Sequence, residues 1–206
     1  MRISIRGKVL LVGACMMAGL GAWGQQAPST AAKKGINFDL AVNYTAEKAE
    51  QSPSYCGCFW LQGGSTDLST ILWKGLGVAV AFNGDTASAI NTGVDLTKIE
   101  GMAGPRYTTR VGHVGGSKHP VSVFGEGLAG RVWAFNSNFA TKYGTVVSDK
   151  TAIAFEAGGG INVRVNRYLA VRAIQVDFVR NYLPNTGGDV QNNARVSFGA
   201  IYHFGK

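Results

Sequence analysis

Two cysteines separated by one residue form the most unusual local feature of the sequence. Cys56 and Cys58 flank a glycine, and the only other cysteine, Cys15, lies in an apolar N-terminal run. Cysteines this close bridge only through a strained ring, and a strained disulfide is more easily reduced than an ordinary one. Two free thiols and a metal site are the alternatives, but no His lies nearby to complete a tetrahedral site. We expect a local disulfide.

Three histidines and a run of three glycines are the other groups that could take part in chemistry. His113 and His119 fall in a short predicted turn, and His203 lies near the end of the last predicted strand. The glycines at 158–160 lie within an extended segment that no helix follows, so they lack the context of a phosphate-binding loop. Such glycines more often allow close approach of neighbouring chains. We predict no catalytic residue, no metal and no cofactor.

The composition of the chain is typical of an all-β protein. Of the 206 residues, 29 are glycine and 5 are proline, and charged residues make up 16%. Glycine and β-branched residues are weak helix formers, and here they are spread along the whole length. The 20 Lys and Arg residues are scattered among 12 Asp and Glu residues. Nucleic-acid binding has little support, because no basic cluster with interleaved aromatics occurs.

The N-terminal segment has the three-part form of a secretory signal peptide. Arg2, Arg6 and Lys8 form a basic head, and an apolar run over residues 9–22 leads to small residues that end at Gly24. This run is too short for a spanning helix. We therefore predict that a signal peptidase cleaves the chain after Gly24.

Cleavage at this position divides the chain into three parts: a signal peptide (1–24), a short polar lead-in (25–35) and one barrel domain (36–206). A lipoprotein processing box at Cys15 is the alternative, but the apolar run continues well past that cysteine. No later segment contains about 18 consecutive apolar residues, which excludes a helical membrane protein. In a membrane, the mature chain would have to form a closed β-barrel, which pairs every backbone polar group.

Extended segments alternate with turn-rich segments after the lead-in, and their connections differ in length. Those after the second, fourth and sixth strands are mostly short, and the others are consistently long. Transmembrane barrels have tight periplasmic turns and longer external loops, whereas a soluble barrel has no physical reason for this asymmetry. The predicted strands are residues 36–45, 58–71, 75–83, 94–111, 120–136, 151–165, 168–182 and 190–204.

The best predicted strands alternate between apolar and polar residues. In the first, Phe38, Leu40, Val42 and Tyr44 share one face. Alternation alone does not separate a soluble barrel from a membrane barrel. Both alternate, and they differ only in whether the apolar face points into the barrel or out of it. If the barrel spans a membrane, its polar face lines the lumen, and the charged residues that we place there are Glu126, Glu156, Asp177, Arg106, Arg164 and Arg172.

These charges favour a packed interior. Eight strands enclose just enough space for side chains to fill, and buried charges must be paired. We interpret them as a salt-bridged plug, with a narrow gated ion path as the functional alternative. Arg172 has the opposite parity to Gln175 and Asp177. All three point inward only if the strand has an irregularity, such as a bulge near Ala173.

The C-terminal strand carries the strongest signal. Its apolar face ends in Tyr202 and Phe204, where a membrane barrel has an aromatic girdle. Ser197, Gly199, Tyr202 and Phe204 match every fixed position of the assembly signal of bacterial outer-membrane barrels, although two residues follow Phe204 here. The sequence therefore predicts an eight-stranded antiparallel up-and-down transmembrane β-barrel.

From residue 36 to 204 the chain resembles the OmpA/OmpX-type outer-membrane β-barrel families. Typical features are the run AGPRY at 103–107 and the run LAVRAIQVD at 169–177. The resemblance implies a bacterial outer-membrane location, contact with outer-membrane lipids, and transient binding to periplasmic chaperones and the barrel assembly machinery. It implies a structural, surface-interaction or weak pore role, and it names no surface partner.

Two other functions remain open from the sequence. Some barrels of this size are lipid A-modifying enzymes with a His/Ser/Glu arrangement near the outer leaflet. Here the three histidines, His113, His119 and His203, all fall at the predicted periplasmic end, so we expect no enzyme. The other alternative is a secreted, soluble, lipocalin-like barrel that binds a ligand.

Overall fold

The computed structural model describes residues 37–50, 58–91, 94–115, 118–137, 139–140, 146–184 and 189–205. The chain divides into two units, Met1–Lys34 and Gly35–Lys206, and all described residues belong to the second. The predicted signal peptide and polar lead-in lie outside the described residues. So does Cys56 of the predicted disulfide.

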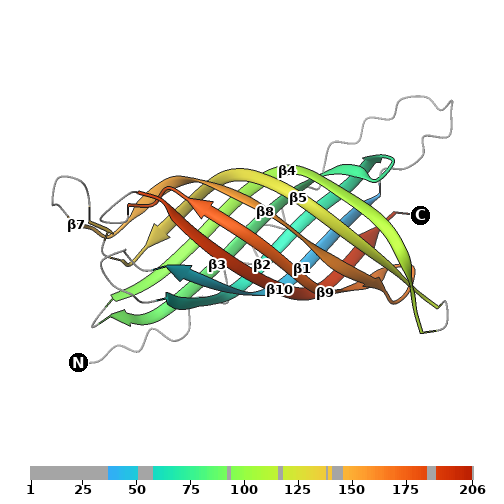
Figure 1. Ribbon diagram of the computed structural model, residues 1–206, viewed down its shortest axis with the longest axis horizontal. Coiled ribbons are helices and arrows are strands. Elements are labelled where there is room, and N and C mark those ends of the chain that lie inside the picture. Colours follow the sequence, from blue (N-terminus) through green and yellow to red (C-terminus); the bar gives the residue numbers. More distant parts are fainter. Residues whose placement is uncertain are drawn as a thin grey trace, which may run out of the picture. The chain divides into compact units, whose positions relative to one another are not determined.

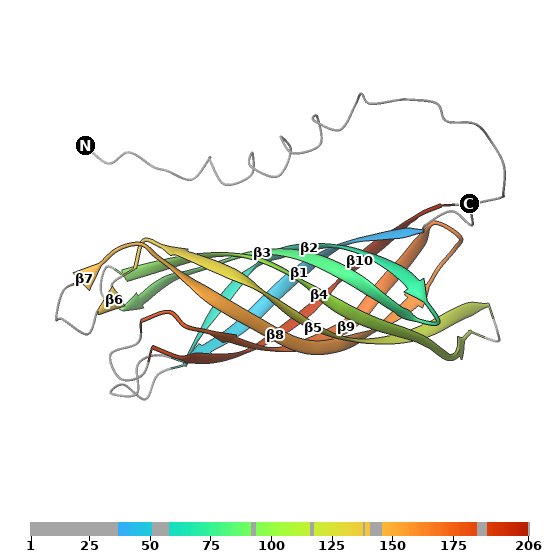
Figure 2. The ribbon, with the colours of Figure 1, turned by 90° about the horizontal axis from the view of Figure 1, so that it is seen from above.

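The described residues form a closed antiparallel β-barrel of eight strands (Figures 1 and 2). Each strand pairs with its sequence neighbour, and β10 pairs with β1 to close the ring, as an up-and-down barrel requires. The predicted fold class is therefore confirmed. The strands are β1 (Phe38–Glu50), β2 (Cys58–Trp73), β3 (Leu76–Asn91), β4 (Val94–Val114), β5 (His119–Phe135), β8 (Lys150–Arg164), β9 (Leu169–Asn181) and β10 (Gln191–Phe204).

Two strands run at least five residues further than the sequence pattern predicts. Residues 46–50 continue β1 and residues 84–91 continue β3, although both segments were assigned to external loops. The turn-like composition of these segments is overridden by cross-strand pairing, since Lys48 pairs with Trp60 and Asp85 pairs with Lys98. In the predicted loop after β5, a two-stranded sheet forms from β6 (Phe139–Ala140) and β7 (Val146–Val147).

The connections at one end of the barrel are short. Lys74 and Gly75 join β2 to β3 with positive φ values of 44° and 93°, the geometry of a tight hairpin turn. Between β8 and β9, the Asn166 side chain accepts hydrogen bonds from the backbone N–H groups of Tyr168 and Leu169, at 2.8 and 2.9 Å. This end, here called the turn end, also holds the start of β1 and the end of β10, and strands β6 and β7 lie at the opposite end (Figure 2).

The irregularity expected near Ala173 is present. Ile161 on β8 pairs with Ile174, and its neighbour Asn162 pairs with Arg172, so the register skips Ala173. This bulge puts both Arg172 and Gln175 on the inner face, where each is almost fully buried. A regular strand would have turned one of the two outward.

The two faces of the barrel differ sharply in polarity. Large apolar side chains cover the outside, where Val42 is 56% exposed, Phe82 59% and Phe178 51%. The inner face carries most of the buried polar and charged side chains, together with small apolar ones. Leu61, Leu96 and Leu183 belong to an apolar cluster that packs inside the barrel. This arrangement is the inverse of a soluble protein, in which apolar side chains gather inside.

The glycine run in β8 marks a close approach between strands. A Cβ at Gly160 would lie 2.5 Å from the carbonyl oxygen of Ile174 and 2.9 Å from the Phe124 ring. A Cβ at Gly159 would collide with the carbonyl oxygen of Phe124. These positions accept no side chain without a backbone shift, which agrees with the structural role expected for the run.

Candidate functional site: the charged lumen

The lumen holds a dense set of ionisable side chains. Among the described residues, seven acids and four bases are buried in it, each less than 10% exposed. Burying a charge is costly unless it is paired, so their contacts determine what the interior can do. The acids are Glu47, Asp67, Asp85, Glu100, Glu126, Glu156 and Asp177, and the bases are Lys98, Arg106, Arg172 and Arg195.

Arg195 of β10 is the centre of one cluster, here called the Arg195 cluster. Its guanidinium donates to Glu47 at 2.7 Å, to Glu156 at 2.8 Å and also to Glu100. Lys98 contacts Glu47 and lies 3.0 Å from Glu100, so two bases hold three acids from β1, β4 and β8. All of these side chains are between 0% and 4% exposed.

Asp67 of β2 is the centre of the second cluster, here called the Asp67 cluster. Arg106 of β4 and Arg172 of β9 each lie 2.6 Å from one of its carboxylate oxygens. Arg106 also pairs with Glu126 at 2.6 Å. The Phe124 ring lies beneath both guanidinium groups, 4.7 Å from that of Arg106 and 4.8 Å from that of Arg172. An aromatic face and a shared carboxylate thus hold two like charges side by side.

Gln175 extends the Asp67 cluster toward further carboxylates. Its amide oxygen accepts a hydrogen bond from Arg172 at 2.7 Å, and its amide nitrogen donates to Glu126 at 3.0 Å and to Asp177 at 2.9 Å. Gln175 can make these three hydrogen bonds because the bulge at Ala173 turns its side chain inward. The result is a continuous network of hydrogen bonds across the lumen.

Two groups of carboxylates have the spacing of cation ligands. Glu47, Asp85 and Glu100 form one, and Glu126, Glu156 and Asp177 form the other, with oxygens within 4.8 Å of one another. In the first group Lys98 and Arg195 already supply the positive charge that a metal ion would bring. The first group is therefore part of a structural ion-pair network.

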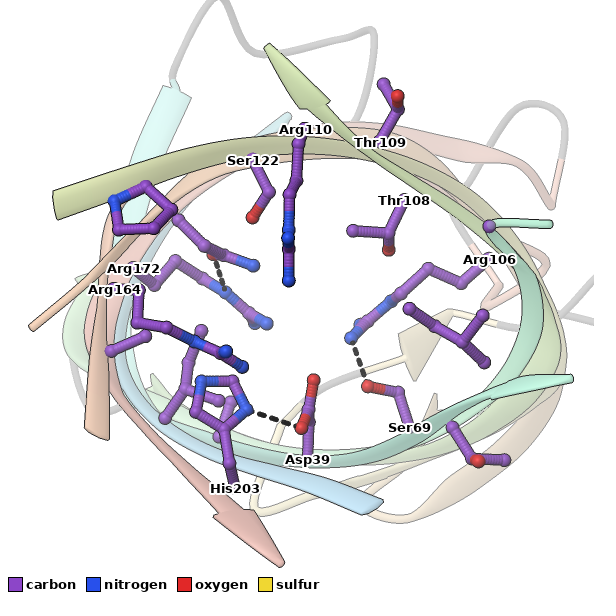
Figure 3. Close-up of a pocket in the computed structure, with 18 of the residues that line it drawn as sticks. Asp39, Ser69, Arg106, Thr108, Thr109, Arg110, Ser122, Arg164, Arg172 and His203 are labelled. Carbon is purple, nitrogen blue, oxygen red and sulfur yellow. Dashed lines mark hydrogen bonds and ion pairs between the residues drawn. The ribbon is translucent and has the colours of Figure 1, made fainter. Parts of the chain in front are cut away.

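A cavity of about 270 Å³ opens between the Asp67 cluster and the turn end (Figure 3). Four arginines line it, together with His203. Two of them, Arg110 and Arg164, extend into the cavity in Figure 3 and make no ion pair among the described residues. The lumen is therefore rich in carboxylates at depth and rich in guanidinium groups near this end.

The structure places all six charged residues expected inside the barrel on its inner face. Glu126, Arg106 and Arg172 meet in the Asp67 cluster, and Glu156 contacts Arg195. Asp177 joins through Gln175. Arg164 stays apart from both clusters and lines the cavity.

Among the described residues, six further charges that are buried in the interior were missed by sequence reasoning: Glu47, Asp67, Asp85, Lys98, Glu100 and Arg195. Glu47 and Asp85 fall in segments that were assigned to loops. The other four lie inside predicted strands and have the inward parity of their neighbours, as Arg195 does with Ser197. Extending the alternation along each whole strand would have found them.

The residues of the assembly signal lie along β10. Ser197 and Gly199 face the lumen, whereas Tyr202 and Phe204 point outward at 42% and 45% exposure. The Tyr202 ring contacts Phe204, with centroids 4.6 Å apart, and stacks on Tyr168 at 6.3 Å. An aromatic patch thus lies on the outer surface at the turn end.

The other candidates for chemistry lie apart from the buried network. His203 Nδ1 is 2.5 Å from Asp39, and His119 Nδ1 is 3.1 Å from the carbonyl oxygen of Arg164, both at the turn end. Cys58 begins β2, where it is exposed and has no disulfide partner among the described residues. Its predicted bridge to Cys56 stays a prediction, because Cys56 lies outside the described residues.

An outward apolar surface, an inward ionic network and up-and-down closure define the class of the fold: an eight-stranded β-barrel of the kind found in outer-membrane proteins. Solved structures of this class are similar to the chain. Neisserial surface protein A is 16% identical with a TM-score of 0.59, covering 81% of this chain and 97% of that one. Ail of Yersinia pestis is 17% identical with a TM-score of 0.53, covering 82% and 99%. No protein-family model and no curated protein matches the sequence.

Proposed function

We propose that this protein is an integral barrel of the bacterial outer membrane that anchors surface-exposed segments and carries out no catalysis. The polarity of its two faces carries the proposal. Contiguous apolar patches above a few hundred Å² are rare on soluble monomers. Here every long strand presents apolar side chains outward, with Val78, Val176 and Phe198 between 46% and 54% exposed.

A lipid environment accounts for this surface. Each exposed apolar group costs about 25 cal/mol per Å² in water and nothing comparable in hydrocarbon. The inner face supports the same conclusion, since Arg195 and Asp67, the centres of its two clusters, are paired with oppositely charged side chains of other strands. In the part of the chain that the structure describes, no helix is long and apolar enough to cross a membrane.

The orientation follows from the connections. Outer-membrane barrels keep their tight turns on the periplasmic side and their longer loops outside. We therefore expect the two-residue turn at Lys74 and Gly75 to face the periplasm, and the segments around residues 51–57 and 136–149 to lie on the outer side. These outer segments are where we expect a surface partner to bind.

An anchoring role is favoured over a pore by the closed lumen. The Arg195 cluster and the Asp67 cluster fill the cross-section with side chains that are at most 9% exposed. A structural neighbour offers a fold-level analogy only: Ail is described as an attachment invasion locus protein, and one structure holds it in complex with the heparin analogue sucrose octasulfate. The lipid A-modifying alternative has no support from the histidines, because His119 and His203 lie at the turn end.

The same proposal implies transient partners during assembly. A chain with this much apolar outward surface needs periplasmic chaperones before insertion. The aromatic end of β10, with Tyr202 and Phe204, suits recognition by the barrel assembly machinery. Outer-membrane lipids are then the permanent partner.

Membrane fractionation with a heat-dependent gel shift tests the proposal. We expect the protein to resist carbonate extraction and to show a faster-migrating folded band in unboiled samples. Extraction by carbonate with no folded band would favour the soluble barrel. A mass shift in lipid A on expression would favour the enzyme, and regular conductance steps in a planar bilayer would favour the pore.

A further inference from the structure

We propose that the cavity at the turn end of the lumen is a binding site for phosphate groups. The site goes beyond an anchoring role, because it would give the periplasmic face of the barrel a ligand of its own. Its volume of about 270 Å³ is enough for a diphosphate or a small phosphate ester.

The free guanidinium groups are the first observation. Arg106 and Arg172 are held by Asp67, whereas the side chains of Arg110 and Arg164 have no hydrogen bond or ion pair among the described residues. Figure 3 shows Arg110 reaching into the middle of the cavity and Arg164 pointing inward from the wall. Four guanidinium groups around one cavity repel one another, and a bound anion would relieve that repulsion.

The register places neutral donors beside these arginines. Arg110 on β4 pairs with Ser122 on β5, and Ser122 pairs with Asn162 on β8, so three inward side chains lie in one row. The Asn162 amide oxygen accepts a hydrogen bond from Arg172 at 3.4 Å. Its amide nitrogen remains as a donor beside the hydroxyl group of Ser122.

The acidic residues of the cavity are already engaged. Asp67 accepts from two arginines, and Asp39 on β1 lies 2.5 Å from His203, its pairing partner on β10. The lining therefore has a surplus of positive charge over the region where Arg110 and Arg164 point. Donors that converge from β4, β5 and β8 suit the several oxygens of a tetrahedral phosphate better than a planar carboxylate.

Binding of pyrophosphate, measured by titration calorimetry, tests this site. The protein is extracted from membranes into a glycoside detergent, which carries no phosphate. We expect saturable one-to-one binding that weakens as the salt concentration rises. Arg110→Gln and Arg164→Gln should each weaken binding about tenfold, and the double variant more, because each removes a charge-assisted hydrogen bond.

Arg131→Gln is the matched control, since Arg131 is an exposed arginine on the outer face of β5. It should change the affinity less than about twofold. Each variant must keep the heat-dependent gel shift, which reads the fold in the same sample and separates loss of the site from loss of the barrel. No saturable binding to the unmodified protein, or an equal loss in Arg131→Gln, would overturn the proposal.

A second experiment identifies the source of the phosphate group. The pyrophosphate titration is repeated with the protein in phospholipid nanodiscs. If the headgroups of the adjacent leaflet fill the site, pyrophosphate affinity falls in nanodiscs, and the Arg110→Gln and Arg164→Gln double variant abolishes this difference. If the ligand is a free phosphate compound, the affinity is the same in nanodiscs and in detergent. Both results support the site and assign its ligand.

Discussion

Arg195 on β10 and Glu100 on β4 lie diametrically across the barrel, four strands apart in either direction, and their side chains are joined by a hydrogen bond. Contacts between neighbouring strands fix only local pairing. A contact between opposite walls fixes the diameter of the lumen and connects the two halves of the ring. Glu47 and Glu156 converge on the same guanidinium from two other strands.

Arg195→Gln should therefore destabilise the whole barrel. It leaves three buried carboxylates with Lys98 as the remaining base of their cluster, and removing one partner from a buried pair costs about 3–5 kcal/mol. Reversible urea unfolding in lipid vesicles, followed by tryptophan fluorescence, measures the change. Arg180→Gln, on an exposed outward position of β9, is the control. Equal stability of the two variants would show that Arg195 is dispensable.

Asp67 and Arg172 should be energetically coupled. Their charged atoms lie 2.6 Å apart, and the residues are separated by 105 positions in the chain. We expect a double-mutant cycle with Asp67→Asn and Arg172→Gln to give a coupling energy of about 1–3 kcal/mol. The same cycle between Asp67→Asn and Arg131→Gln should give a value near zero. Additive effects in the first cycle would mean that the pair contributes nothing specific.

The cost of a charge on the outer face should depend on its depth. Val176→Arg places a charge near the middle of β9, and Leu169→Arg places one at its first residue, at the turn end. In a bilayer, Val176→Arg should lower the free energy of unfolding by about 2–4 kcal/mol and Leu169→Arg by about 0–1 kcal/mol. Unfolding in vesicles measures both. A soluble barrel would tolerate both arginines, since Val176 and Leu169 would then face water.

Gly160→Ala should impair folding, whereas Gly127→Ala should not. A Cβ at Gly160 meets the Ile174 carbonyl oxygen at 2.5 Å, and a Cβ at Gly127 meets nothing within 4 Å. Overpacking of this kind costs about 1–3 kcal/mol. The fraction of folded band in unboiled gels compares the two variants. A normal folded fraction for Gly160→Ala would show that β8 and β9 can separate slightly at no cost.

The strands could be predicted, because the alternation of apolar and polar residues is a local pattern. The ion-pair network of the lumen could not be predicted in this way. Phe38, Leu40, Val42 and Tyr44 of β1 all point outward, as their pattern predicts. Which charges touch depends on the shear of the barrel, which no short window of sequence contains. Asp67 finds Arg172 across more than a hundred residues. Glu47 and Asp85 were missed because turn-like composition hides strands whose polar side is satisfied inside the lumen.

The Ala173 bulge could be predicted in part from the sequence. Arg172, Gln175 and Asp177 have incompatible parities, and this conflict was visible in the sequence. If buried charges and their partners all face the lumen, the strand must contain a bulge. The cavity arginines, Arg110 and Arg164, lacked any such conflict, so their shared position emerged only from the register.

Because β1 pairs with β10, the barrel closes only when its last strand has joined the sheet. Phe38 pairs with Phe204, the most distant pairing of the barrel along the chain, so the ring is sealed only after every other hairpin is available. Until then β1 and β9 each present a bare hydrogen-bonding edge, which is a template for aggregation. Such long-range pairings are also slow to form. The time for which these two strand edges stay unpaired therefore depends on how quickly β10 joins the sheet.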